Sequence, residues 1–344
     1  MRSILVAIIA VLTLLAPASA APPKLPELAS TDAVMRWMAG YRANPDPATV
    51  PVAVRVLSRN AAFKDPETSG SYVGFVAGIL AANPARAEEL IGKMLVIRGE
   101  DHWVIVRAIA FSGLPNWKHL LRKYAHRMPT RQVMIDKYVA GHLPTLFELT
   151  AEKSPTVLER MRNAVSFSNK SETKPATLDS SPEWLDTFWG YYYATGTYRP
   201  ISRVVSMLPW SKDNDNVEKL TIGSMAKYTL VSNAARDAAL LGMLKRERDH
   251  YPKEVVAILD EVINAADTVD TARVRKEALA SIEEIKRKGP GYRRNVSFWG
   301  QVGQGALALG CIAAAATGHI ELGLPCVVGG GASSAAMYYW NNNP

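Results

Sequence analysis

The sequence predicts an all-α protein made of antiparallel helix hairpins. Apolar residues recur three or four positions apart along most of the chain, and alternating strand-like runs are scarce. Short turns containing Asn, Gly or Pro separate successive apolar segments. With 48% hydrophobic residues, the chain can also build a sizeable core. We expect helices over residues 32–41, 50–57, 72–82, 85–97, 103–111, 117–126, 132–140, from 182 to about 195, 201–208, 217–231, 236–250, 252–266 and 271–288.

An aromatic stretch over residues 181–210 predicts the hairpin around which the chain is organised. Ser181 suits an N-cap and Pro182 suits the first position of a helix. Gly196 suits the C′ position that ends this helix, and Pro200 can open the next one.

Aromatic side chains cover nearly every face of the first helix of this hairpin, so we expect it to be buried on most sides. Because Trp and Tyr offer flat apolar faces with a polar edge, four of them are candidates for a ligand groove. Packing in the core is the alternative, and it is the interpretation that we prefer. The four residues are Trp184, Trp189, Tyr191 and Tyr193.

Three segments repeat the order of an apolar helix, a short turn and a second helix opened by proline; they begin at Phe75, Ile105 and Phe188. A fourth copy begins at Lys227, with alanine in place of the proline. Pro84 and Pro115 lie roughly thirty residues apart, the length of one helix-turn-helix unit. In this order of elements, residues 47–288 resemble tetratricopeptide-like and HEAT-like arrays. The resemblance implies an architecture, an irregular α-solenoid of stacked hairpins, and no particular activity.

The N-terminus predicts export. Arg2 provides a basic start, residues 5–15 an apolar segment, and Ala18-Ser19-Ala20 a small-residue cleavage site. We therefore expect a periplasmic or extracellular protein. The predicted organisation is a signal peptide (1–20), an extended lead-in with a short helix (21–46), an N-terminal helical-repeat half (47–166), a polar linker (167–181), a C-terminal helical half (182–289) and a Gly/Ala-rich apolar tail (290–344).

The tail holds both cysteines of the chain, Cys311 and Cys326. In an oxidising compartment this arrangement favours a disulfide. Three interpretations of the tail stay open: a stapled hairpin docked on the helical body, a membrane-associated hairpin, and a surface for assembly. A basic run just before the tail could contact anionic headgroups; it comprises Lys286, Arg287, Lys288, Arg293 and Arg294.

Local motifs for catalysis are missing from the sequence: there is no H-E-x-x-H, P-loop, G-x-S-x-G or strand followed by G-x-G-x-x-G. Ser224 and Lys227 fit the S-x-x-K motif, but its companion motifs S-D-N and K-T-G are lacking. We therefore expect this match to have arisen by chance. The acids of Glu100-Asp101-His102 suit a helix start before Trp103. His119 and His126 stand among cations and predict a solvated basic face rather than a metal site. We predict no catalytic residue, cofactor or metal.

The formal charge of +8 allows an acidic partner, and the densest positive zone lies between residues 118 and 137. Candidates for contact with an anionic partner are Lys118, Arg122, Lys123, Arg127 and Arg131. Nucleic acid is not expected for an exported chain without a recognition motif. The sequence thus predicts a non-enzymatic binding or scaffold module whose partner is a protein or another envelope component. The alternatives are a membrane-associated protein acting through its tail, including contact with an anionic membrane surface, and a cell-wall-acting enzyme.

Overall fold

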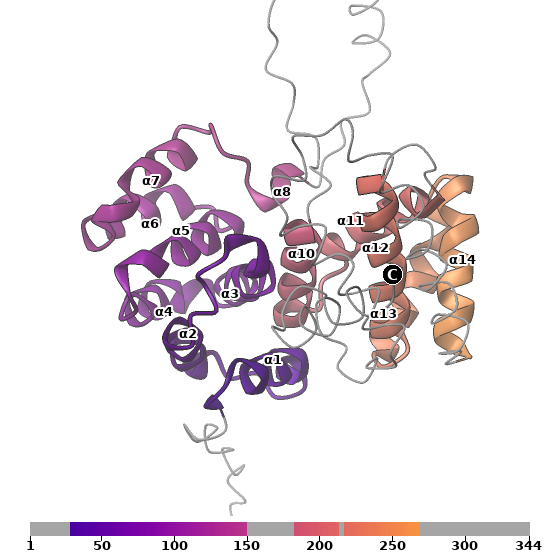
Figure 1. The fold of residues 1–344 in the computed structure, drawn as a ribbon, viewed down its shortest axis with the longest axis horizontal. Helices are drawn as coiled ribbons and strands as arrows, with labels where there is room; N and C mark the ends of the chain where they lie inside the picture. The colour runs from indigo at the N-terminus through magenta and orange to yellow at the C-terminus, as the bar shows by residue number, and fades with distance from the viewer. Residues whose placement is uncertain (1–27, 150–181, 213–216, 269–344) are drawn as a thin grey trace, which may run out of the picture.

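The computed structural model describes residues 28–149, 182–212 and 217–268, and within these ranges every regular element is a helix (Figure 1). The predicted all-α class is confirmed. The predicted helices that fall in these ranges begin and end within about three residues of the observed ones. The signal peptide, the 167–181 linker, the 271–288 helix and the tail with Cys311 and Cys326 lie outside the described residues.

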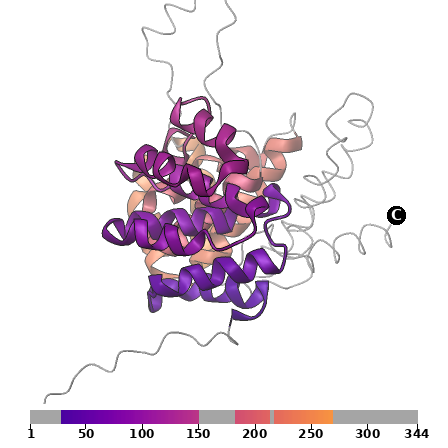
Figure 2. The ribbon, with the colours of Figure 1, turned by 90° about the vertical axis from the view of Figure 1, so that its left-hand side faces the viewer.

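The first part of the chain forms two layers of helices, seen from one side in Figure 2. Helices two apart along the chain pack on each other: α2 on α4, α3 on α5, and α5 on α7. This alternation is the neighbour relation expected in a helical array, and the repeat interpretation itself stays a prediction. The helices are α1 (Thr31–Gly40), α2 (Val50–Arg59), α3 (Gly70–Ala82), α4 (Ala87–Met94), α5 (His102–Phe111), α6 (Trp117–Tyr124), α7 (Gln132–Val139) and α8 (Leu146–Leu149).

The second part comprises α10 (Pro182–Thr195), α11 (Tyr198–Ser206), α12 (Val217–Ala234), α13 (Ala238–Glu247) and α14 (Lys253–Asp267). Gly196 adopts the left-handed conformation predicted for it, with φ +66°, and its N–H donates to Tyr192 O at 2.7 Å. The next helix starts earlier than predicted, at Tyr198 rather than at Pro200. Pro200 is tolerated because N–H groups in the first turn have no partner within the helix.

The contact between α3 and α10 joins the two parts of the chain. Three glycines, Gly70, Gly74 and Gly78, recur every fourth residue and therefore share one face of α3. A Cβ atom at Gly74 would lie only 2.0 Å from the carbonyl oxygen of Thr187 on α10. Reciprocally, a Cβ atom at Gly190 of α10 would lie 2.0 Å from the carbonyl oxygen of Ser71. The two backbones are thus in direct contact, and only glycine fits at these positions.

The two helices run parallel, because Gly70 lies against Glu183 and Gly78 lies against Tyr191 and Ala194. Every residue of α3 from 70 to 80 is buried, since α5 packs on another face of this helix. Helix α3 is therefore a central element, and it fixes where α5 and α10 lie. None of the helices in the described ranges combines the length and hydropathy needed to cross a bilayer.

Candidate functional site

The four aromatic residues considered for a ligand groove, Trp184, Trp189, Tyr191 and Tyr193, lie in the core or packed against it. Trp189 is fully buried, and its indole N–H donates to Thr229 Oγ1 at 3.0 Å. Tyr193 is buried too, and its hydroxyl donates to Asn233 Oδ1 at 2.7 Å. Their polar atoms are satisfied inside the protein, so this placement agrees with the core-packing interpretation.

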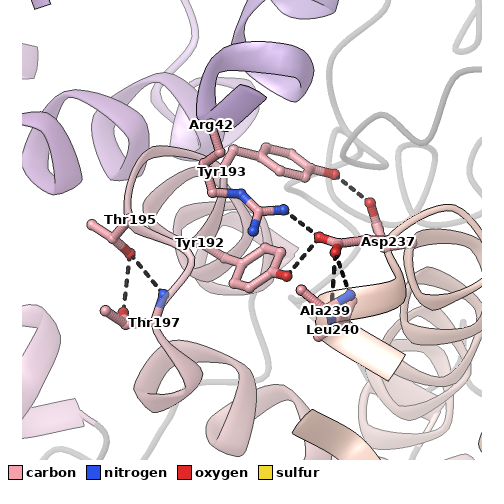
Figure 3. A network of polar contacts seen from close by, with 9 residues as sticks. Arg42, Tyr192, Tyr193, Thr195, Thr197, Asp237, Ala239 and Leu240 are labelled. Carbon is pink, nitrogen blue, oxygen red and sulfur yellow. Dashed lines mark hydrogen bonds and ion pairs between the residues drawn. The ribbon is translucent and has the colours of Figure 1, made fainter. Parts of the chain in front are cut away.

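A polar network near these rings fastens the N-terminal helices to the second part of the chain (Figure 3). Asp237 is paired with Arg42, accepts a 2.6 Å hydrogen bond from the Tyr192 hydroxyl, and caps α13 through Ala239 N and Leu240 N. Burial raises the pKa of Asp237, but the hydrogen bonds from Tyr192 and Arg42 outweigh it and bring the pKa below its ordinary value. This network joins the turn after α1 to α10 and to the start of α13.

A groove of about 840 Å³ opens elsewhere, between segments that are far apart in the sequence. One side is formed by the turn after α2, at residues 61–66. The others come from residues 98–107, which include the 3-10 helix η6 (Gly99–Asp101) and the start of α5, and from residues 131–143 around α7. The two-layer packing of the helices brings these turns together, because α5 lies between α3 and α7.

The floor of the groove is apolar. Phe63, Trp103 and Tyr138 are buried beneath it, and the half-buried Met134 and Leu143 complete it. The indole N–H of Trp103 donates to the carbonyl oxygen of Phe63 at 3.3 Å, so its polar edge is already used. Burial raises the pKa of the Tyr138 hydroxyl, which keeps that group neutral at physiological pH.

Two carboxylates in the groove share one guanidinium. Asp101 is buried and accepts from Ser58 Oγ at 2.6 Å and from Arg98 Nε at 3.0 Å. Glu100 Oε1 lies 3.0 Å from Arg98 Nη1. As expected, both acids lie at a helix start: they belong to η6, and Asp101 is the N-cap residue of α5, although its side chain makes no capping hydrogen bond. It joins α5 to the end of α2 instead.

Arg107 lies at the inner end of the groove among aromatic rings, with its side chain 14% exposed. Its guanidinium carbon lies 5.5 to 5.7 Å from the ring centroids of Trp103, Phe111 and Trp184. It also pairs with Glu183 of α10. Burial alone would lower the pKa of Arg107, but the charge of Glu183, the interaction with Tyr138 and the hydrogen bonds to both residues together outweigh it, and the pKa is raised. This cation is therefore already neutralised.

Lys64 and Arg131 are the groove cations that form no ion pair with a described acidic residue. Arg131 Nη2 donates to the carbonyl oxygen of Glu100 at 2.5 Å. Its Nε is buried and has no hydrogen-bond partner among the described residues. These two residues leave uncompensated positive charge above an apolar floor.

The predicted basic zone is divided by the structure. Lys118, Arg122, Lys123 and Arg127 are exposed on α6 and the turn that follows it, whereas Arg131 is half-buried and lines the groove. Lys123 pairs with Glu88 of α4 at 2.5 Å. His119 and His126 are exposed, and no metal-binding group of His, Cys, Asp and Glu occurs in residues 28–149, 182–212 and 217–268.

Sequence reasoning missed the groove because its residues come from three separate segments, parts of turns and of α5 and α7, that no local motif connects. The available signals were Glu100 and Asp101 beside Arg98, and the proline-bounded basic turn that ends at Arg131.

The S-x-x-K pair also has a structural explanation, since Lys227 Nζ pairs with Glu261 at 2.7 Å. Comparisons of the chain with protein-family models, with curated proteins and with solved structures found no match.

Proposed function

We propose that this chain is an exported α-helical binding module that holds part of another envelope macromolecule in the groove between the turn after α2, η6 and α7. One observation carries the proposal: an apolar floor lies beneath two cations, Lys64 and Arg131, that have no described acidic partner. Lys64 is exposed and Arg131 is half-buried, so both charges are accessible to a ligand that also covers the apolar surface.

The size of the groove supports this function. Its volume of about 840 Å³ falls within the roughly 300–1,000 Å³ of sites that enclose small ligands or short segments of larger ones. Its walls are turns together with parts of the packed helices α5 and α7. Asp101, for example, is bonded to both Ser58 and Arg98, which fixes the end of α2 against η6. A groove built this way is largely formed before a ligand arrives.

Binding is better supported than catalysis. The carboxylates of the groove, Glu100 and Asp101, are both engaged by Arg98, as in a structural ion-pair cluster. A cell-wall-acting enzyme would need a carboxylate available to exchange a proton or attack a substrate.

Export is proposed from residues 1–20 alone. The membrane-associated alternative depends on the tail; if it holds, deleting residues 293–344 moves the protein from the membrane fraction to the soluble fraction.

Site-specific photo-crosslinking in the producing cells tests the proposal. A benzoylphenylalanine at Met134 faces the groove, whereas the same probe at the adjacent Val133 is a matched control, because Val133 is 70% exposed and does not line the groove. We expect a discrete, reproducible adduct from position 134 and none of the same mass from position 133. No adduct from either position, or the same adduct from both, would refute groove binding.

A further inference from the structure

We propose that the ligand of this groove is an acidic peptide segment of a partner protein, with a carboxylate held by Lys64 and Arg131 and an apolar side chain on the floor. This inference rests on the proposed function and specifies its partner. It follows from the charges that the groove leaves uncompensated, from the sign of the remaining charges, and from the way the aromatic rings are buried.

The charge balance of the groove calls for an anion. Arg98 is offset by Glu100 and Asp101, and Arg107 is offset by Glu183. Lys64 and Arg131 form no ion pair with a described acidic residue, and, because Arg98 is set against two carboxylates, the four cations and three carboxylates leave one net positive charge. The guanidinium of Arg131 suits a carboxylate because its planar N–H groups match two carboxylate oxygens. A carboxylate there would also give an acceptor to the Nη groups of Arg131, for which the described residues give only the Glu100 carbonyl, whereas Nε is buried away from solvent.

The neighbouring acids favour a singly charged group over a phosphate. The side chain of Glu100 is 68% exposed at the groove, and Asp101 lines it as well. Both would repel an incoming anion, and the repulsion grows with the charge of the ligand. Two cations beside two acids therefore suit a carboxylate better than a group carrying nearly two negative charges.

The floor favours a peptide over a glycan. Sugars bind aromatic residues through exposed ring faces, but Phe63, Trp103 and Tyr138 are 1%, 8% and 3% exposed and so offer little ring surface. The accessible part of the floor includes Met134 and Leu143, whose flexible aliphatic chains can pack around an apolar side chain. An acidic residue next to an apolar one in an extended segment would satisfy both the rim and the floor.

The test uses fluorescein-labelled peptides and the mature full-length chain, followed by fluorescence anisotropy. The probe alternates Glu and Leu; the reference peptides alternate Glu with Ser, and Lys with Leu. We expect the Glu/Leu probe to bind best. Lys64→Glu and Arg131→Glu should each weaken this binding about tenfold or more. Arg122→Glu makes the same change of charge on the exposed face of α6, outside the groove, and should weaken it less than about twofold. Circular dichroism and thermal unfolding check that each variant folds.

Five results would overturn the inference. Equal losses in Arg122→Glu and Arg131→Glu would show general attraction between charges. Equal affinity for the Glu/Leu and Glu/Ser peptides would remove the role of the floor. Tighter binding to phosphate-rich polymer or to anionic lipid vesicles than to the probe would assign another partner. If benzoylphenylalanine at position 134 forms an intermolecular adduct but the Glu/Leu peptide does not bind, the peptide inference fails while groove binding stands. An adduct at the mass of the single chain would overturn both.

Discussion

Replacing Gly74 by alanine tests the contact between α3 and α10. The added Cβ would lie 2.0 Å from the Thr187 carbonyl oxygen, whereas an unstrained contact needs about 3.5 Å. The helices would have to move apart by roughly 1.5 Å. Overpacking costs about 1–3 kcal/mol, and the upper end applies because a backbone carbonyl cannot rotate away as a side chain can. Since alanine returns about 1 kcal/mol of helix propensity, we expect a net loss of about 2 kcal/mol.

Gly242→Ala is the matched control. Gly242 lies inside α13, and the nearest atom to a Cβ added there is Arg246 Nη1 at 3.5 Å, on a flexible side chain. Here the propensity gain should dominate, so this variant should be stabilised by about 1 kcal/mol. Urea unfolding followed by circular dichroism and tryptophan fluorescence measures both free energies of unfolding. A Gly74→Ala midpoint at or above that of the unchanged protein would refute direct backbone contact.

Three further substitutions test local features by the same unfolding measurement. Ala61 has a φ of +56°, so Ala61→Gly should stabilise the protein by about 1 kcal/mol; a loss would show that this turn is not strained. Asp237 has a folded-state pKa below its unfolded value, so its stabilisation is complete above about pH 4 and is lost as the pH falls through the folded pKa. The stability gap between the unchanged protein and Asp237→Asn should therefore narrow from pH 6 to pH 3, and a constant gap would contradict the assignment. Arg107→Lys keeps the charge but loses the planar contact with three rings, and should cost about 1–2 kcal/mol, whereas the exposed Arg86→Lys should cost about zero. Equal costs for Arg107→Lys and Arg86→Lys would argue against a stabilising contact between Arg107 and the three rings.

The sequence alone predicted the helices well because the signals for them are local. Apolar spacing and the turn residues between segments placed the described helices to within about three residues, and Gly196 was correctly expected to end α10. The buried aromatic helix could also be anticipated, since its rings cover more than one face. Pro200 misled the start of α11, because proline is accepted anywhere in a first turn.

The α3–α10 contact and the groove could not be derived from these signals, because each depends on contacts between residues far apart in the sequence. Gly70, Gly74 and Gly78 stand at the spacing of close helix contacts, but the pattern does not say which helix lies against it. Arg131 looked like one more member of a basic run, and only the packing of α7 beside α5 turns it toward Glu100. Local periodicity defines faces, whereas tertiary packing decides which faces meet.

The α3–α10 contact and the groove are physically linked through Glu183. Its carbonyl oxygen lies against Gly70 in the α3–α10 contact, while its carboxylate pairs with Arg107 at the inner end of the groove. Any change that separates α3 from α10 therefore also moves the partner of a groove cation. Conversely, a ligand that binds only the folded groove stabilises the arrangement of α5 and α10 that forms it, by an amount set by its concentration and affinity. The close glycine packing between α3 and α10 thus also helps to hold Arg107 and its carboxylate partner in place at the groove.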